Sequence, residues 1–194
     1  MASDRLLHTQ QRAAQWPRRA LLLMLACVPA WMTAQPTDVE RVKSAFIFHF
    51  VQLVDWDEAT ESTSGTTSIC AYRLDPMSDT LAGTTDGKMA GRRVLRVRQL
   101  RITDSLQGCR VLYVGREAPA RLDALLQSAQ SASILTIGEG ESFLSQGGVI
   151  AFVEDGSRLR FEVSLTSAQR SHVKVSARLL LLALRVIGGA DGRP

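Results

Sequence analysis

The feature that most constrains the fold is a run of five residues, Val149–Val153, that contains no polar side chain. Successive strand residues point to opposite faces, so a strand of this kind must be buried on both sides. The turn pair Asp155-Gly156 follows, and Arg158–Leu165 then alternates between apolar and polar residues. The inward positions are expected to be Leu159, Phe161 and Val163, and the outward ones Arg158, Arg160 and Glu162. The sequence predicts a central strand in a hairpin, with helices covering both faces.

Short strands alternate with short helices before this hairpin. The predicted strands are 68–74, 93–99, 109–115 and 134–137, and the predicted helices are 75–81, 119–129 and 141–146. A last helix is expected from a Ser176 cap to Ile187. Such alternation is typical of α/β domains. We expect one domain over residues 35–194 with an α/β fold: a three-layer sandwich with a mixed, mostly parallel sheet, a C-terminal antiparallel hairpin and helices on both faces.

A longer helix is predicted from the Thr37–Glu40 capping box to about Trp56. It has two apolar faces, whereas a surface helix has one. The first face comprises Val39, Val42, Phe46, His49, Phe50 and Leu53, and the second comprises Ile47, Phe48, Val51 and Val54. Two arrangements are open: Ile47, Phe48 and Val51 form a dimer interface, or the helix is buried within one chain. His49 is expected to be a hydrogen-bonded core residue.

Residues 1–34 are expected to be a signal peptide. Arg18-Arg19 precedes an apolar stretch, 20–31, that is shorter than the roughly 20 residues of a membrane span. Cleavage is predicted before Gln35. The alternatives are a buried core helix, a lipoprotein signal with Cys27 lipidated, and a twin-arginine signal. Ordinary export places the chain in the periplasm.

Removing this leader changes the charge of the chain. The full sequence has a net charge of +4, but residues 1–34 contain four arginines and one aspartate. The remainder has 19 basic and 18 acidic side chains, a net charge of +1. Phosphate binding needs a sustained basic surface, so a nucleic-acid partner is not expected.

Two cysteines remain after the leader, Cys70 and Cys109, and both lie in strand-like segments. An even number of cysteines in an exported domain favours a disulfide. Two buried free thiols are the alternative. A pair of cysteines without histidine partners does not complete a zinc site, so no metal is expected.

The sequence contains no recognisable catalytic motif, such as a nucleophile elbow, P-loop, zinc-protease helix or dinucleotide fingerprint. Gly138-Glu139-Gly140 is interpreted as a strand-to-helix turn. Glu154-Asp155 is a carboxylate pair at a hairpin tip. Contact with solvent there does not provide the buried environment that acid–base catalysis needs. We therefore expect no catalytic residue, no cofactor and no enzymatic activity.

One polar stretch stands out near the C-terminus. Arg170, His172 and Lys174 alternate in an apparently extended segment, with Arg178 in the next helix and Glu162 on the polar face of the hairpin. These residues, Glu162, Arg170, Lys174 and Arg178, are candidates for a partner-docking or anion-binding patch. A solvated polar edge is the alternative.

Short motifs follow one another in a specific order along the chain. They are Val42–Phe46, Asp55-Trp56, Ser68–Cys70, Gly91–Val94, Cys109–Tyr113, Ile134–Ile137, Gly147–Ile150, Leu159–Val163 and Lys174–Leu180. This ordered set resembles the YfiR-like family of periplasmic regulators and covers essentially the whole chain after residue 35. The chain departs from the family at His49, where Asn is usual, and at Asp57, where Pro is usual. It also lacks the second cysteine pair found in some members.

The resemblance implies a periplasmic, often dimeric α/β protein without enzymatic activity. Better-understood members bind the periplasmic sensor region of an inner-membrane diguanylate cyclase and hold it inactive, which limits cyclic-di-GMP and biofilm formation. The resemblance also implies that Cys70 and Cys109 match the family's cysteine pair. A different class of function is a periplasmic small-molecule-binding module that works with an envelope transporter or receptor, with Arg170 and Lys174 holding an anionic ligand.

Overall fold

The computed structural model describes residues 38–56, 65–72, 74–116 and 121–188. The predicted signal peptide and Thr37 of the capping box lie outside these residues. The helices are α1 (Asp38–Gln52), α2 (Pro76–Thr85), α3 (Leu122–Ser131), α4 (Glu141–Ser145), α5 (Leu165–Arg170) and α6 (Ala177–Leu182). The strands are β1 (Val54–Trp56), β2 (Thr66–Tyr72), β3 (Met89–Ala90), β4 (Arg93–Leu100), β5 (Val111–Tyr113), β6 (Leu135–Glu139), β7 (Ile150–Asp155), β8 (Arg158–Ser164), β9 (Val173–Val175) and β10 (Arg185–Ile187).

The main sheet has the strand order β10-β8-β7-β6-β5-β2-β4-β3, while β1 and β9 form a separate antiparallel pair. Strand β2 pairs in parallel with β4 on one side and with β5 on the other. The chain reaches β4 through α2 before it crosses to β5. A parallel sheet whose order reverses in this way leaves a crevice at the carboxyl ends of the two strands at the reversal. Here those strands are β2 and β5.

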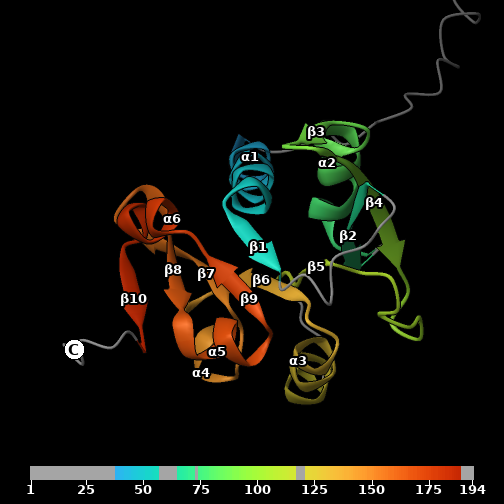
Figure 1. Cartoon of the computed structure of the whole chain (residues 1–194). Coiled ribbons are helices and arrows are strands. Elements are labelled where there is room, and N and C mark those ends of the chain that lie inside the picture. The colour runs from blue at the N-terminus through green and yellow to red at the C-terminus, as the bar shows by residue number, and fades with distance from the viewer. Residues whose placement is uncertain (1–37, 57–64, 73, 117–120, 189–194) are drawn as a thin grey trace, which may run out of the picture. The chain divides into compact units, whose positions relative to one another are not determined.

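Each face of the sheet carries its own apolar core. Ile69 and Ala71 of β2 belong to a core shared with α1 and α2, whereas Cys70 between them belongs to a second core with Leu126 of α3 and Phe143 of α4. Figure 1 shows α1 and α2 on one side of the strands and α3 and α4 on the other. The predicted α/β fold, with a mostly parallel sheet and helices on both faces, is confirmed.

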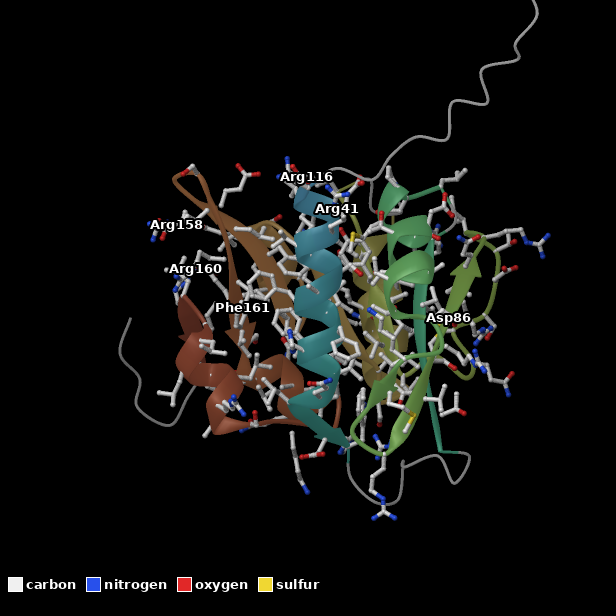
Figure 2. All side chains as sticks on the ribbon, turned by 90° about the horizontal axis from the view of Figure 1, so that it is seen from above. Arg41, Asp86, Arg116, Arg158, Arg160 and Phe161 are labelled. Atoms are coloured by element: carbon white, nitrogen blue, oxygen red, sulfur yellow. A yellow bond between two sulfur atoms is a disulfide. The ribbon has the colours of Figure 1, made fainter. Side chains whose placement is uncertain are left out.

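The predicted central strand and its hairpin are also confirmed. Strand β7 pairs with β6 in parallel and with β8 in antiparallel register, which places Phe152 opposite Phe161. Phe46 and Phe50 of α1 pack on these two rings, with 4.8 Å between the ring centroids of Phe50 and Phe161. Figure 2 shows α1 in front of this part of the sheet, with Phe161 labelled beside it. The aromatic cluster fixes α1 against the hairpin.

The first helix is shorter than predicted. It ends at Gln52, and β1 follows, where the sequence pattern had suggested further helix to Trp56. Strand β1 pairs with β9, so that Trp56 lies opposite Val173. An apolar run of this length does not distinguish a helix end from a buried strand, because the pairing partner lies more than a hundred residues later in the chain.

The predicted inward face of α1 is buried only in part, at Phe50 and around Phe46. Ile47 and Val51 lie in the core, and α2 packs beside α1. Val39, Val42 and His49 of the predicted inward face are exposed, so the prediction of a buried His49 was wrong. The ring of His49 contacts only the edge of Phe48 among the ring contacts of the described residues.

The C-terminal segment differs from the prediction at two places. Arg170 ends a short helix, α5, rather than beginning an extended stretch, because Ser164 caps that helix by accepting a hydrogen bond from the Ser167 backbone N–H. Ser176 caps α6 as predicted, accepting from the Leu179 N–H at 3.3 Å. Helix α6 ends at Leu182, and β10 then adds to the sheet in parallel with β8. The predicted helix to Ile187 was therefore too long.

Cys70 and Cys109 form a disulfide, as predicted, and both residues are buried. Their Cα atoms are 5.8 Å apart, within the usual range for such a bond. The bond links β2 to the segment just before the neighbouring strand β5. It therefore fastens the two strands at which the sheet order reverses.

Candidate functional site

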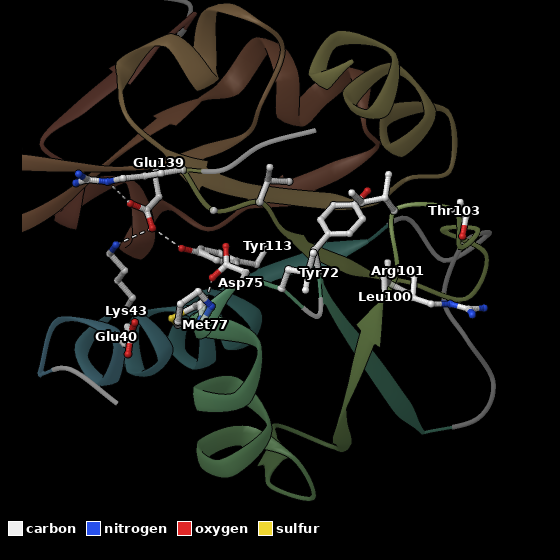
Figure 3. A pocket seen from close by; sticks show the side chains of 16 residues that line it. Glu40, Lys43, Tyr72, Asp75, Met77, Leu100, Arg101, Thr103, Tyr113 and Glu139 are labelled. Atoms are coloured by element: carbon white, nitrogen blue, oxygen red, sulfur yellow. Dashed lines mark hydrogen bonds and ion pairs between the residues drawn. The ribbon is translucent and has the colours of Figure 1, made fainter. Parts of the chain in front are cut away.

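A cavity of about 790 Å³ lies at the carboxyl ends of four strands. Tyr72, Leu100, Tyr113 and Glu139 line it from the ends of β2, β4, β5 and β6. Further lining residues are Glu40 and Lys43 on α1, Leu74–Met77 at the start of α2, Arg101–Thr103 after β4, and Val114–Arg116 after β5. Figure 3 shows this arrangement. Its position is the crevice that the reversed strand order leaves, and its volume suits a small organic molecule.

Glu139 accepts three hydrogen bonds at one end of the cavity. The Lys43 ammonium donates to Oε1 at 2.6 Å, and the Tyr113 hydroxyl donates to the same oxygen. The Arg116 guanidinium donates its Nε–H to Oε2 at 2.9 Å. In Figure 3 Lys43 and Tyr113 converge on this carboxylate from two different elements. Glu139 thus ties β6 to α1 and β5.

These contacts set the titration of the cluster. Burial alone would raise the pKa of Glu139, but the hydrogen bonds from Lys43, Tyr113 and Arg116 outweigh it and hold that pKa below its ordinary value. Burial, and then the hydrogen bond to Glu139, raises the pKa of the Tyr113 hydroxyl. The cluster is therefore ionised at Glu139 and neutral at Tyr113 around neutral pH.

Asp75 lies in the same cavity with a different environment. Its Oδ1 accepts the Met77 backbone N–H at 2.8 Å and so caps α2, as the sequence predicted. Burial, followed by the negative charge of Glu139, raises the pKa of Asp75, and the Met77 hydrogen bond only partly opposes this. Among the described residues, no ion pair joins Asp75.

Asp75 leaves no room for a side chain at Gly115, two residues after β5, unless its carboxylate moves. A Cβ atom added to Gly115 would lie 1.6 Å from the Asp75 Oδ2 atom. The carboxylate occupies the space that any side chain at position 115 would need. Gly115 therefore lets the start of α2 approach the end of β5 and close one wall of the cavity.

Arg116 continues the cluster on the outer side of Glu139. Its second terminal nitrogen donates to Glu154 Oε1 at 2.7 Å, so the predicted carboxylate pair at the hairpin contributes one member to an ion-pair chain. Lys43, Arg116 and Glu139 also line a second, smaller cavity of about 330 Å³. The ion pairs of Glu139 with Lys43 and Arg116 thus lie between the two cavities.

Glu162 does not face solvent as the alternation of β8 suggested. It is buried, and both of its oxygens accept hydrogen bonds from Arg185 of β10, at 2.9 and 2.7 Å. The addition of β10 beside β8 covers this position, which the sequence analysis had expected to stay on an open edge. Glu162 therefore holds β10 on the sheet.

The three predicted cations near the C-terminus lie on three elements. Arg170 ends α5, Lys174 lies in β9 and Arg178 lies in the first turn of α6, and all three are exposed. None of them lines the cavity between β2 and β5. Their role in docking or ligand binding stays a prediction.

The predicted dimer residues on α1 differ in exposure. Ile47 is fully buried and Val51 nearly so, and both belong to the core of the single chain, whereas Phe48 keeps part of its surface. Ile47 and Val51 are therefore buried within the single chain and need no second copy to cover them. The dimer interface stays a prediction.

The sequence analysis missed Lys43, Asp75, Tyr113 and Glu139 as members of one site. A signal was present at Lys43, which lies one turn before Ile47 on the buried face of α1, where a lysine needs an acidic partner. Glu139 and Tyr113 end adjacent parallel strands, the usual place for ligand-binding residues. The strand order that joins these signals could not be deduced from the sequence.

Neither a metal-binding cluster nor a membrane-spanning helix is found among the described residues. No group of three or more His, Cys, Asp or Glu side chains is placed there to hold a metal ion. In that same part of the chain, no helix has the length and apolar character required to cross a membrane.

Comparison with solved structures places the fold among known ones. A conserved domain protein from Vibrio cholerae O1 biovar eltor strain N16961 is similar with a TM-score of 0.50 and 9% identity, over 76% of this chain and 60% of that one. The ABC domain in complex with L-Trp from Streptococcus pneumonia has a TM-score of 0.48 and 14% identity, over 72% and 60%. The chain thus spans 60% of the length of each. The first similarity supports the fold alone, and the second is too weak to support an argument.

A comparison with protein families gives a broader match. The YfiR/HmsC-like family matches residues 40–184, which include nearly every described element. The match contains the disulfide, the aromatic cluster of α1 and the residues around the cavity. The chain belongs to the YfiR/HmsC-like family, whose members are periplasmic regulators rather than enzymes.

Proposed function

We propose that this protein is a periplasmic regulator that binds the periplasmic region of an inner-membrane diguanylate cyclase and holds the cyclase inactive. The observation that carries this proposal is the family match over residues 40–184. A regulator of this kind acts by binding one conformation of its partner more tightly than the other. Release from the cyclase would raise cyclic-di-GMP and promote biofilm formation.

The apolar surface around α6 and β10 is our candidate for the docking site. Leu181, Leu182, Leu184 and Ile187 are exposed there, close in sequence to the predicted partner residue Arg178. Strand β10 ends the strand order of the main sheet, so one of its edges is open to pairing among the described residues. Open edges accept extended segments of other proteins. We therefore assign this surface to an extended part of the cyclase's periplasmic region.

Deletion of the gene tests the function itself. Cyclic-di-GMP and biofilm mass are expected to rise in the deletion strain and to return to the wild-type level when the gene is restored. Unchanged cyclic-di-GMP in the deletion strain would contradict the proposal.

Two variants at positions of similar exposure test the docking surface. Leu182 is 57% exposed on α6, and Met89 is 53% exposed on β3 at the opposite end of the strand order. Leu182→Asp is expected to weaken capture of the cyclase's periplasmic region by about tenfold, because a buried apolar contact becomes a charge. Met89→Asp is expected to leave capture unchanged. Equal loss in both variants would reject this surface.

Homodimerisation through α1 is a separate part of the proposal. Phe48 is the predicted interface residue that keeps accessible surface, so Phe48→Asp is expected to convert a dimer to a monomer in light scattering. The exposed Gln52 on the same helix provides a control, Gln52→Asp. A dimer mass retained by the Phe48 variant would reject this interface.

Export by a signal peptide completes the proposal. The protein isolated from the periplasm is expected to begin at Gln35, which N-terminal sequencing would show. Retention of the leader in the isolated protein would contradict cleavage at this site.

A further inference from the structure

The polar end of the cavity between β2 and β5 contains one carboxylate, Asp75, that forms no ion pair with another described residue. Glu40, Asp75 and Glu139 line it. The two cations nearest to them, Lys43 and Arg116, are both bound to Glu139. The third lining cation, Arg101, is bound to Asp104 at 3.1 Å. Asp75 is thus left without an ion-pair partner among the described residues.

Asp75 is also placed to receive a donor from the cavity. Its Oδ1 atom is occupied by the Met77 N–H, and its Oδ2 atom lies over the backbone of Gly115. Figure 3 shows the Asp75 carboxylate beside Tyr113, among the residues that line the cavity. A half-buried carboxylate of this kind is stabilised by a cationic hydrogen-bond donor.

The opposite side of the cavity is apolar and partly open. Leu74 is 84% exposed and Ile102 is 69% exposed, and these two residues are among the most exposed large apolar side chains of the described chain. Both line the cavity, together with Leu100 and the ring of Tyr72. Exposed apolar side chains that gather at one cavity indicate a binding surface, whereas isolated ones do not.

We propose that this cavity binds a small organic amine, with the ammonium group at Asp75 and an apolar body against Leu74, Leu100 and Ile102. The volume of about 790 Å³ accommodates such a molecule. This site is distinct from the docking surface on α6 and β10, and it does not depend on the cyclase as partner. A bound amine would give Asp75 the ion-pair partner that the described residues do not supply.

Three probes that differ only in the head group test the charge requirement. Isothermal calorimetry on the full chain after residue 34 would compare phenylethylamine and longer phenylalkylamines with the matching neutral alcohols and with phenylalkanoates. The amines are expected to bind most tightly and the carboxylates least. Tighter binding of a carboxylate than of the amine would overturn the proposal, as would no binding of any amine at millimolar concentration.

Asp75→Asn tests the position of the ammonium group. Asparagine caps a helix as well as aspartate does, so α2 stays capped while the charge is lost. Amine affinity is expected to fall about tenfold, and alcohol affinity to stay the same. Asp79→Asn, on the exposed face of the same helix, is the control and is expected to change neither. Unchanged amine affinity in Asp75→Asn would overturn the proposal.

A second variant tests the apolar half of the site. Leu74→Ser removes a side chain that is largely exposed, so folding is not at risk. It is expected to weaken the amine and the alcohol by the same factor, because both use the apolar body. Binding of both probes at wild-type strength would place the ligand elsewhere and overturn the assignment.

Discussion

Glu139 on β6 and Asp75 at the start of α2 line the same cavity, yet their surroundings shift their pKa values in opposite directions. The Glu139 side chain is only 8% exposed, but it accepts hydrogen bonds from Lys43, Tyr113 and Arg116. Asp75 is also partly buried, but it accepts one backbone N–H. The comparison shows that the supply of donors, rather than burial alone, decides the direction in which the pKa of each carboxylate shifts. Glu139 receives its hydrogen-bond donors from within the protein, whereas Asp75 can accept a further donor from a ligand.

The largest effect on stability is expected when the ion pair between Lys43 and Glu139 is removed. Lys43→Met should lower the free energy of unfolding by about 3 kcal/mol, because it leaves a buried carboxylate without its ammonium partner. Chemical denaturation at neutral pH would measure this loss. Arg41→Met, on the exposed part of the same helix, should change stability by less than about 0.5 kcal/mol. A similar small change in both variants would contradict the role assigned to Glu139.

A smaller loss of stability is expected when the close approach of Asp75 to Gly115 is disturbed. Gly115→Ala forces the Asp75 carboxylate away from its capping position and should lower the free energy of unfolding by about 1–2 kcal/mol. The control is Gly83→Ala within α2, where no atom lies within 4 Å of the new Cβ. That variant should raise stability by about 0.5–1 kcal/mol, because alanine favours helix over glycine. Thermal or chemical denaturation distinguishes the two signs, and a gain in both would contradict the close approach of Asp75.

The smallest effect is expected from removal of the Asp75 charge. The pKa of Asp75 is raised in the folded state, so its contribution to stability is greatest below the unfolded pKa and is lost as the pH rises through the folded one. Asp75→Asn should therefore equal the wild type near pH 3 and exceed it at pH 7 by less than about 1 kcal/mol. Denaturation curves at both pH values would measure the difference. If Asp75→Asn is less stable than the wild type at pH 7, the folded protein stabilises the ionised Asp75 carboxylate, which would contradict its raised pKa.

Local patterns predicted most of the elements. The apolar run of β7 and the Asp75 and Ser176 caps each depend on neighbouring residues, and they were found as predicted. The turn predicted at Asp155-Gly156 lies one residue later, at Gly156-Ser157. The errors lie where a distant partner decides the structure. β1 is a strand because β9 pairs with it, and Glu162 is buried because β10 covers it.

The cavity could be predicted only in part for the same reason. Lys43, Tyr113 and Glu139 are separated by dozens of residues, and they meet because the chain crosses from β4 over β2 to β5. A lysine on the buried face of α1 indicated an acidic partner, but it did not indicate which one. Asp75 was found as a helix cap, and its second role in the cavity depends on Gly115 in the loop after β5.

Carbon-13 NMR titration of the side-chain carboxyl groups of Asp75 and Glu139 tests the central comparison most directly. Glu139, Glu40, Lys43 and Tyr113 face Asp75 from β6, α1 and β5, so their titrations must be followed in the same experiment. The account predicts that the pKa of Asp75 lies above the ordinary value of 3.8 and that the pKa of Glu139 lies below 4.5. An Asp75 pKa at or below 3.8 would contradict it, because the carboxylate would then already have a cationic partner within the protein.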